Sequence, residues 1–190
     1  RSTLLPLVNN KKWLNLGGGH HITRNDYQLN DLKYFLKKVS YETNCQIYIE
    51  PGEAVVLDSG ILVGEVIDLF KHSNPLSKNI AITDISATSH IPDVIEAPYR
   101  PALLNEPNKG NKVILGGPSC LAGDIIGEYN FTEIPKIGDR IALLDQAHYT
   151  MVKTSFFNGV KLPSIAIWDS ETDDLEIIKT FSFQDFVNKL

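Results

Sequence analysis

The chain has 190 residues, of which 43% are hydrophobic, and this composition is that of an ordinary globular protein rather than a disordered one. Its 18 basic and 23 acidic residues give a formal net charge of -5, and no run of Lys or Arg is longer than two residues. This charge pattern excludes an electrostatic nucleic-acid-binding surface and is compatible with a cationic ligand.

The two cysteines, Cys45 and Cys120, lie in different sequence contexts without a Cys-x-x-Cys motif. They indicate neither a disulfide framework nor a zinc ribbon, although a disulfide between them remains an alternative. No apolar run approaches the roughly 20 residues of a membrane span, and the first residues lack the pattern of a signal peptide. We therefore expect a cytoplasmic protein that binds no membrane.

The first fifty residues predict one α/β repeat. Residues 13–16 predict a short strand that runs into three glycines, and apolar residues then recur at helical spacing from Leu32 to Val39. Residues 45–51 predict the next strand. Such repeats normally pack in a parallel sheet or barrel, because one repeat cannot bury its own apolar face.

From Ala54 onward, short apolar segments alternate with turn residues. This pattern predicts an antiparallel sheet, folded as a sandwich or small barrel. The expected strands cover residues 54–58, 61–70, 79–85, 111–117, 139–145, 163–169 and 175–181. An amphipathic helix is expected over residues 182–190, with Ser182 as its N-cap.

The glycine run suggests an anion site. After a strand, Gly17, Gly18 and Gly19 would let backbone amides approach a phosphate closely. The run matches neither GxGxxG nor a P-loop, so a plain turn is the alternative. His20 and His21 would point to opposite sides of an extended backbone, so we expect no shared metal.

Glu50 is a second candidate, because it lies where the carboxyl end of a parallel strand would deliver a side chain to the active face of a barrel. The alternative is a solvated carboxylate at a turn.

The stretch GGPSCLAGD presents Cys120 on a turn after a strand, with Asp124 following. A thiol held in this way can transfer a proton or act as a nucleophile, whereas most free cysteines are inert and buried. A thiol hydrolase would also need a histidine, for which His90 and His148 are candidates. Tyr149 carries a hydroxyl that can close a phosphate pocket.

Five motifs together resemble the family of carboxynorspermidine (carboxyspermidine) decarboxylases. In chain order they are LNLGGGHHITRNDY, IEPGEAVVLDSG, DISATSHIPDVIEAPYRP, LGGPSCLAGD and AHYTMVKTSFFNG. That family belongs with the alanine-racemase-fold (fold type III) decarboxylases, in which an N-terminal (β/α)8 barrel carries pyridoxal 5'-phosphate (PLP) and a β domain completes the site across a homodimer. The resemblance implies decarboxylation of carboxynorspermidine or carboxyspermidine to norspermidine or spermidine in polyamine biosynthesis.

The resemblance also implies a role for each candidate residue. The three glycines and Tyr149 would hold the cofactor phosphate, and Glu50 would pair with the pyridine nitrogen. Cys120 would reprotonate the substrate carbon in the neighbouring subunit's site. A cationic, polyamine-type substrate would contact the remaining candidates, which are Glu53, Asp84, His90, Asp93 and Asp124. Glu53 stands where ornithine decarboxylases have an arginine, and an extra carboxylate suits a substrate with additional ammonium groups.

The resemblance divides the chain into residues 1–55, the last βα units of the barrel, and residues 56–190, the β domain with its terminal helix. A complete (β/α)8 barrel takes about 250 residues, and no lysine here matches the family's Schiff-base lysine. We therefore expect the C-terminal part of an enzyme that works with its own N-terminal portion. The alternative is a non-catalytic module that binds polyamines or regulates a partner.

Overall fold

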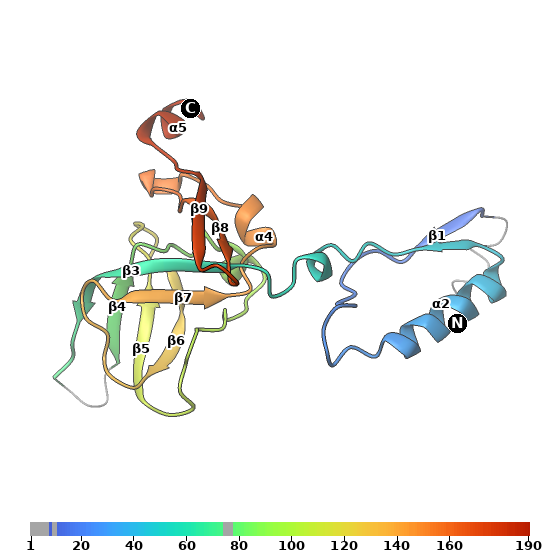
Figure 1. The fold of residues 1–190 in the computed structure, drawn as a ribbon, viewed down its shortest axis with the longest axis horizontal. Helices are drawn as coiled ribbons and strands as arrows, with labels where there is room; N and C mark the ends of the chain where they lie inside the picture. Colours follow the sequence, from blue (N-terminus) through green and yellow to red (C-terminus); the bar gives the residue numbers. More distant parts are fainter. Residues whose placement is uncertain (1–7, 9–10, 74–77) are drawn as a thin grey trace. The chain divides into compact units, whose positions relative to one another are not determined.

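The computed structural model describes residues 8, 11–73 and 78–190. The chain divides into two compact units, Arg1–Leu57 and Asp58–Leu190 (Figure 1).

The first unit contains a strand, a helix and a second strand in the expected order. Strand β1 (Trp13–Asn15) pairs in parallel with β2 (Gln46–Tyr48), and helix α2 (Leu29–Thr43) connects them. The helix ends at Asn44, whose left-handed backbone (φ 53°) is a conformation that Asn tolerates better than most residues. No residue of α2 is buried, and Tyr34 and Phe35 are exposed. The apolar stripe of α2 is therefore only partly covered, since Leu32, Leu36 and Val39 are half-buried.

The second unit is built on a five-stranded sheet with the order β6-β5-β4-β3-β7. Its strands are β3 (Ile61–Phe70), β4 (Asn79–Thr83), β5 (Asn111–Gly116), β6 (Ile125–Phe131) and β7 (Arg140–Leu144). The first half of β3 pairs with β7 and the second half with β4, with a register shift between Val66 and Asp68. The sheet therefore curls around its longest strand (Figure 1).

The expectation of a purely antiparallel sheet is wrong, because β4 and β5 are parallel. A parallel pair needs a long crossover, and the chain between these strands supplies it with helix α3 (Asp93–Glu96) and the loops around it. The sequence shows turn residues in these loops but does not show whether the next strand runs parallel or antiparallel to β4. The sheet is thus mixed.

Two further expectations about strands are wrong. Residues 54–58 are not a strand, since the 3-10 helix η1 (Glu53–Val55) and a turn occupy this stretch. Strand β6 was not expected, because Gly127 interrupts its apolar pattern. A Cβ at Gly127 would lie 3.0 Å from Arg100 Cγ, so the glycine makes room for the Arg100 side chain.

The C-terminal part of the second unit is a hairpin and a short helix. Strands β8 (Ile165–Asp169) and β9 (Asp174–Lys179) pair only with each other among the described strands. Helix α5 (Phe183–Val187) begins with the expected N-cap at Ser182, which forms a capping box with Asp185. Before the hairpin lie α4 (Tyr149–Val152) and the 3-10 helix η2 (Phe157–Gly159).

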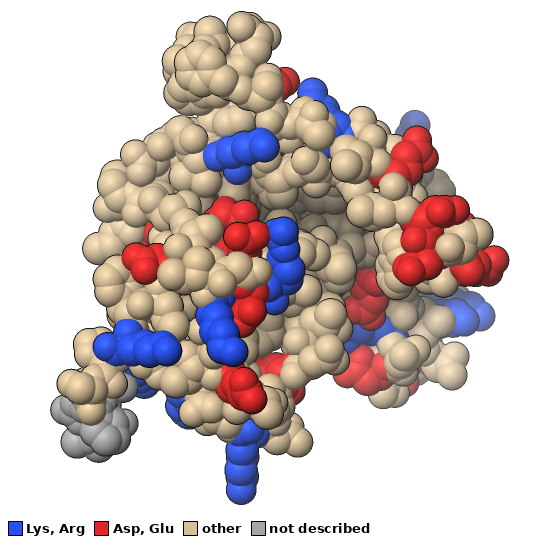
Figure 2. All heavy atoms as spheres, turned by 60° about the vertical axis from the view of Figure 1, so that its left-hand side comes forward, with Lys and Arg blue, Asp and Glu red and all other residues tan. Residues whose placement is uncertain are grey.

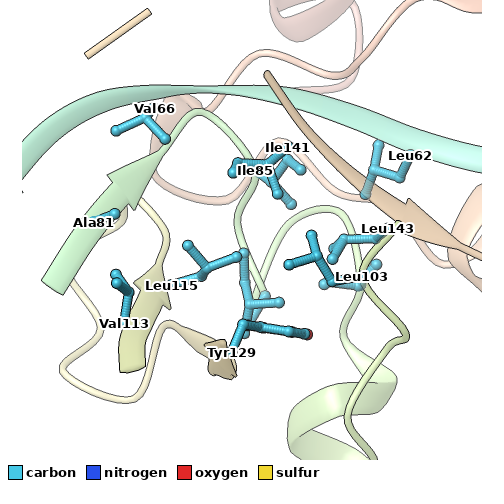
Figure 3. Packing of buried hydrophobic residues seen from close by; sticks show 13 residues of the cluster. Leu62, Val66, Ala81, Ile85, Leu103, Val113, Leu115, Tyr129, Ile141 and Leu143 are labelled. Atoms are coloured by element: carbon cyan, nitrogen blue, oxygen red, sulfur yellow. The ribbon is translucent and has the colours of Figure 1, made fainter. Parts of the chain in front are cut away.

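The core of the second unit lies inside the curl of the sheet, where side chains of all five strands meet (Figure 3). Its largest fully buried residue is Tyr129, whose hydroxyl donates to the Pro101 carbonyl at 2.9 Å. Burial raises the pKa of Tyr129 to about 12, so this hydroxyl stays protonated as a donor. The core thus fixes the sheet from which the connecting loops extend.

Charges on the surface are mixed rather than segregated. On the face shown in Figure 2, basic side chains are scattered and most lie near acidic ones. Glu128, for example, pairs with both Lys78 and Lys112. Within the described ranges, no helix combines the length and apolarity that crossing a membrane requires.

Candidate functional site

The glycine run forms a loop at the carboxyl end of β1. Gly17 and Gly19 have positive φ angles of 75° and 79°, a region that glycine enters without steric cost. A Cβ on Gly18 would lie 2.8 Å from the Glu50 carbonyl oxygen. Among the described residues, the amides of Gly18, Gly19 and His20 have no hydrogen-bond partner. The loop therefore offers consecutive free N–H donors, which suit an anion.

Glu50 lies beside this loop at the carboxyl end of β2. Its amide donates to the Gly17 carbonyl at 2.8 Å. The parallel pairing of β1 and β2 brings the two motifs to the same edge, although they are far apart in sequence. The structure thus brings together Gly17, Gly18 and Glu50.

Asn15 is a neighbour of both motifs that the sequence analysis missed. Its side-chain amide donates to Glu50 Oε1 at 2.5 Å, and its side-chain oxygen accepts from the Gly17 amide at 2.9 Å. The only available signal was its place at the end of the strand before the glycines.

The two adjacent histidines have different neighbours within the first unit. His20 Nδ1 hydrogen-bonds the Tyr27 hydroxyl at 3.1 Å. His21 Nδ1 is buried without a hydrogen-bond partner among the described residues, and it lies 3.9 Å from a Glu53 carboxylate oxygen. Glu53 therefore lies close to the His21 ring rather than being freely solvated.

Cys120 lies on the loop between β5 and β6 in the second unit, and it is an exposed, free thiol. Its backbone amide donates to Asn158 Oδ1 at 2.8 Å. Asn158 has a φ of 59° and belongs to η2. Cys45 is also a free thiol, and it is buried in the first unit.

Asp124 holds the Cys120 loop in place. Its carboxylate is buried and accepts hydrogen bonds from the Ser119 amide (3.0 Å), the Ser86 hydroxyl (2.9 Å) and the Ala87 amide (2.6 Å). The loops at 86–90 and 117–124 are thereby joined through one carboxylate. This position favours a structural task for Asp124 over the direct substrate contact that the resemblance implied.

Replacing Asp124 with Asn is expected to lower the free energy of unfolding by about 2–4 kcal/mol, because an amide NH2 would face N–H donors in a buried place. Urea unfolding of the two proteins measures this difference. Asp174→Asn, at an exposed position of the β8–β9 hairpin, is the matched control and should change stability by less than about 0.5 kcal/mol. Equal effects at both positions would contradict the role of Asp124.

His90 is buried in the same region and uses both of its ring nitrogens. Nδ1 accepts from the Ser86 amide at 3.1 Å, and Nε2 lies 3.0 Å from the Lys161 carbonyl oxygen. This pairing requires the neutral ring with its proton on Nε2. Burial lowers the pKa of His90, which favours the same form. His90 therefore uses both ring nitrogens in protein contacts, which favours a structural role over contact with a cationic substrate.

The lowered pKa of His90 predicts a loss of stability in acid. Below pH 6.5 the unfolded chain binds a proton at this histidine and the folded chain does not, so stability falls as pH falls. The slope from this group is at most about 1.4 kcal/mol per pH unit. Urea unfolding between pH 7.5 and 5.5 should show this slope reduced in His90→Gln. In His72→Gln, at an exposed histidine, the slope should match the wild type, and an unchanged slope in both variants would contradict the assignment.

Three expected site residues lie outside these networks. Asp84 is exposed beyond the end of β4, and its Oδ1 accepts from the Glu65 amide at 2.7 Å. Asp93 forms an ion pair with Lys153, at the end of α4. Tyr149 opens α4, and the residue is 54% exposed.

The second unit thus brings His90, Cys120 and Asp124 together in three loops, at residues 86–90, 117–124 and 155–161, which we name the three-loop cluster. Contacts to the third loop complete it, since the Ser155 amide donates to the Ser89 carbonyl and Asn158 binds the Cys120 amide. Within the described residues, no histidine hydrogen-bonds the Cys120 side chain.

Comparison with known proteins places this architecture in a family. A family model described as "Pyridoxal-dependent decarboxylase, C-terminal sheet domain" matches residues 24–147. This match covers Glu50, the first two loops of the three-loop cluster (residues 86–90 and 117–124), and all five strands of the curled sheet.

Individual relatives are similar over more of the chain. The carboxynorspermidine/carboxyspermidine decarboxylase of Campylobacter jejuni is 40% identical, covering 94% of this chain and 49% of the relative. The carboxyaminopropylagmatine decarboxylase of Synechocystis is 39% identical, covering 94% and 46%. The chain therefore spans about half the length of the curated relatives it matches.

A solved structure agrees with this similarity. The crystal structure of the Campylobacter jejuni carboxynorspermidine decarboxylase complexed with norspermidine matches with a TM-score of 0.79 at 39% identity, covering 94% of this chain and 51% of that chain. Sequence and fold therefore agree on the same group of proteins. This chain belongs to the pyridoxal-dependent decarboxylases, of which it carries the C-terminal sheet domain.

Proposed function

We propose that this chain is the C-terminal part of a PLP-dependent carboxy-lyase of polyamine biosynthesis. One observation carries the proposal, namely that the free amides of the glycine loop lie beside Glu50 at the carboxyl ends of two neighbouring parallel strands. The names of the relatives add support, because each is a decarboxylase.

The residues of the first unit fit the two polar ends of PLP. The amides of Gly18 and Gly19 are donors for a phosphate, and glycine is required at position 18 because a Cβ would strike the Glu50 carbonyl oxygen. Glu50 offers a carboxylate to a protonated pyridine nitrogen. PLP, when bound, supplies the electron sink that accepts the electrons left by loss of CO2.

In the second unit, Cys120 is our candidate for the proton donor. Its exposed thiol stands on a loop fixed by Asp124 and Asn158, and we place its action in the site of a partner subunit in a homodimer. Tyr149 would add its hydroxyl to the phosphate. Glu53 and Asp84 remain our candidates for the cationic substrate, whereas His90 and Asp124 support the loops.

The substrate class we propose is a carboxylated polyamine, decarboxylated at the carbon that bears the carboxylate. The relatives act, by their names, on carboxynorspermidine, carboxyspermidine or carboxyaminopropylagmatine. The first two differ by one methylene, which is worth only about 1–3 kcal/mol in discrimination, so both remain candidate substrates. We further expect a cytoplasmic location.

The test combines this chain with the N-terminal portion that would carry the Schiff-base lysine. The assembled protein should show pyridoxal absorbance and release CO2 from at least one of the three carboxylated compounds, each assayed separately. If carboxyaminopropylagmatine were the preferred substrate, the proposed decarboxylation would stand, but its product would be neither norspermidine nor spermidine. Absence of both pyridoxal absorbance and CO2 release would refute the proposed function.

Two other functions find less support. A non-catalytic module for binding polyamines would not need the combination of glycine loop, Glu50 and Cys120, and the relatives are named enzymes. A thiol hydrolase would need an activated Cys120, which iodoacetamide would label rapidly near neutral pH. We expect slow labelling at Cys120.

A further inference from the structure

Asn15 uses both ends of its side chain between the two motifs of the first unit. It is the last residue of β1, in register with Tyr48 of β2. Its NH2 group lies 2.5 Å from Glu50 Oε1, and its oxygen lies 2.9 Å from the Gly17 amide nitrogen. The glycine loop and the Glu50 carboxylate are therefore joined through one residue.

The chemistry of the two partners fixes the orientation of this amide. The backbone N–H of Gly17 can only donate, so it requires the side-chain oxygen of Asn15. An ionised Glu50 can only accept, so it requires the NH2 group. Aspartate has the same shape but would place a second carboxylate against Glu50, and a shorter or apolar side chain would lose both bonds.

We propose that Asn15 is a positioning residue, which orients the Glu50 carboxylate for the pyridine nitrogen of PLP and ties it to the glycine loop. This inference rests on the proposed function. A hydrogen bond to one oxygen restricts rotation of the carboxylate and leaves the other oxygen for the cofactor. The bond to Gly17 also fixes the start of the loop, whose next amides are free for the phosphate.

The experiment measures PLP binding to the assembled enzyme by absorbance titration. Asn15→Asp should raise the Kd for PLP by at least about tenfold, the weight of one hydrogen bond to a charged group. Asn30→Asp makes the same change at an exposed position of α2 and should leave the Kd within about twofold, since it lies away from these contacts.

A double-mutant cycle separates positioning from general damage. In Glu50→Gln the side chain can donate, so Asp at position 15 would accept from both position 50 and Gly17. Asn15→Asp should then change the Kd in the Glu50→Gln background by less than about threefold. Equal losses in both backgrounds would overturn the coupling between Asn15 and Glu50.

The possible outcomes distinguish this inference from the function on which it rests. Wild-type enzyme that shows pyridoxal absorbance, together with an unaffected Asn15→Asp variant, would overturn the role of Asn15 alone. Wild-type enzyme without pyridoxal absorbance would overturn the proposed function and the role of Asn15 with it.

Discussion

Replacing Gly18 with Ala is expected to raise the Kd for PLP by roughly tenfold to a hundredfold in the assembled enzyme. The new Cβ would lie 2.8 Å from the Glu50 carbonyl oxygen, and a backbone atom cannot move aside as the end of a flexible side chain can. Overpacking of this kind costs about 1–3 kcal/mol, which the loop relieves only by moving. Its free amides then leave the positions in which they suit a phosphate. Absorbance titration with PLP measures the change.

Gly52→Ala is the matched control for this prediction. Gly52 lies in the same unit with a φ of -63°, and a Cβ there meets nothing within 4 Å. This variant should bind PLP as the wild type does. If Gly18→Ala bound PLP equally well, or if both variants lost binding to the same degree, the close approach at Gly18 would not be what shapes the site.

Replacing Cys120 with Ala is expected to lower the rate of product formation by about a hundredfold or more, the usual weight of a positioned proton donor. The ratio of products should also change, because a larger share of the remaining turnover would end in side reactions such as decarboxylation-dependent transamination. The reason is that the exposed thiol is held on a fixed loop, while the alanine has no proton to transfer. Chromatography of the products after a single incubation measures both effects.

Cys45→Ala serves as the control that removes the other thiol. Cys45 is 2% exposed in the first unit, so its loss can reduce stability but should leave the ratio of products unchanged. A Cys120→Ala enzyme that formed the normal product in the normal ratio would exclude Cys120 as the donor.

The sequence predicts the elements whose local pattern is strong. The largely apolar segment Ile61–Phe70 is a strand with the expected bounds, and Ser182 caps the last helix as expected. It misses β6, because Gly127 interrupts the apolar pattern of that strand. The side chains of Arg100 and Tyr129, which a Cβ at Gly127 would approach closely, are known only from the fold. It also misses the parallel pairing of β4 with β5, since the direction of a returning chain depends on contacts distant in sequence.

In the candidate site too, the sequence reveals the residues that belong to a local motif and misses those whose partners are distant in sequence. The glycines and Glu50 are visible from motif and resemblance, and the parallel strands place them side by side. Asn15 and Asn158 are not visible, because each binds a residue distant in sequence. Asn15 donates to the Glu50 carboxylate, and Asn158 accepts from the Cys120 amide. Asp124 was visible as a charge, but its surroundings of donors are known only from the fold.

The buried carboxylate of Asp124 limits which mutations the Cys120 loop can accept. A Cβ at Gly117 would lie 2.4 Å from Asp124 Oδ2, so any side chain at position 117 would displace the carboxylate. Position 117 therefore cannot gain a side chain without a compensating change at Asp124, whereas the exposed Leu121 and Ala122 between them are open to variation. A library that seeks new substrates should keep residues 117 and 124 constant and diversify the tip of the loop around Cys120.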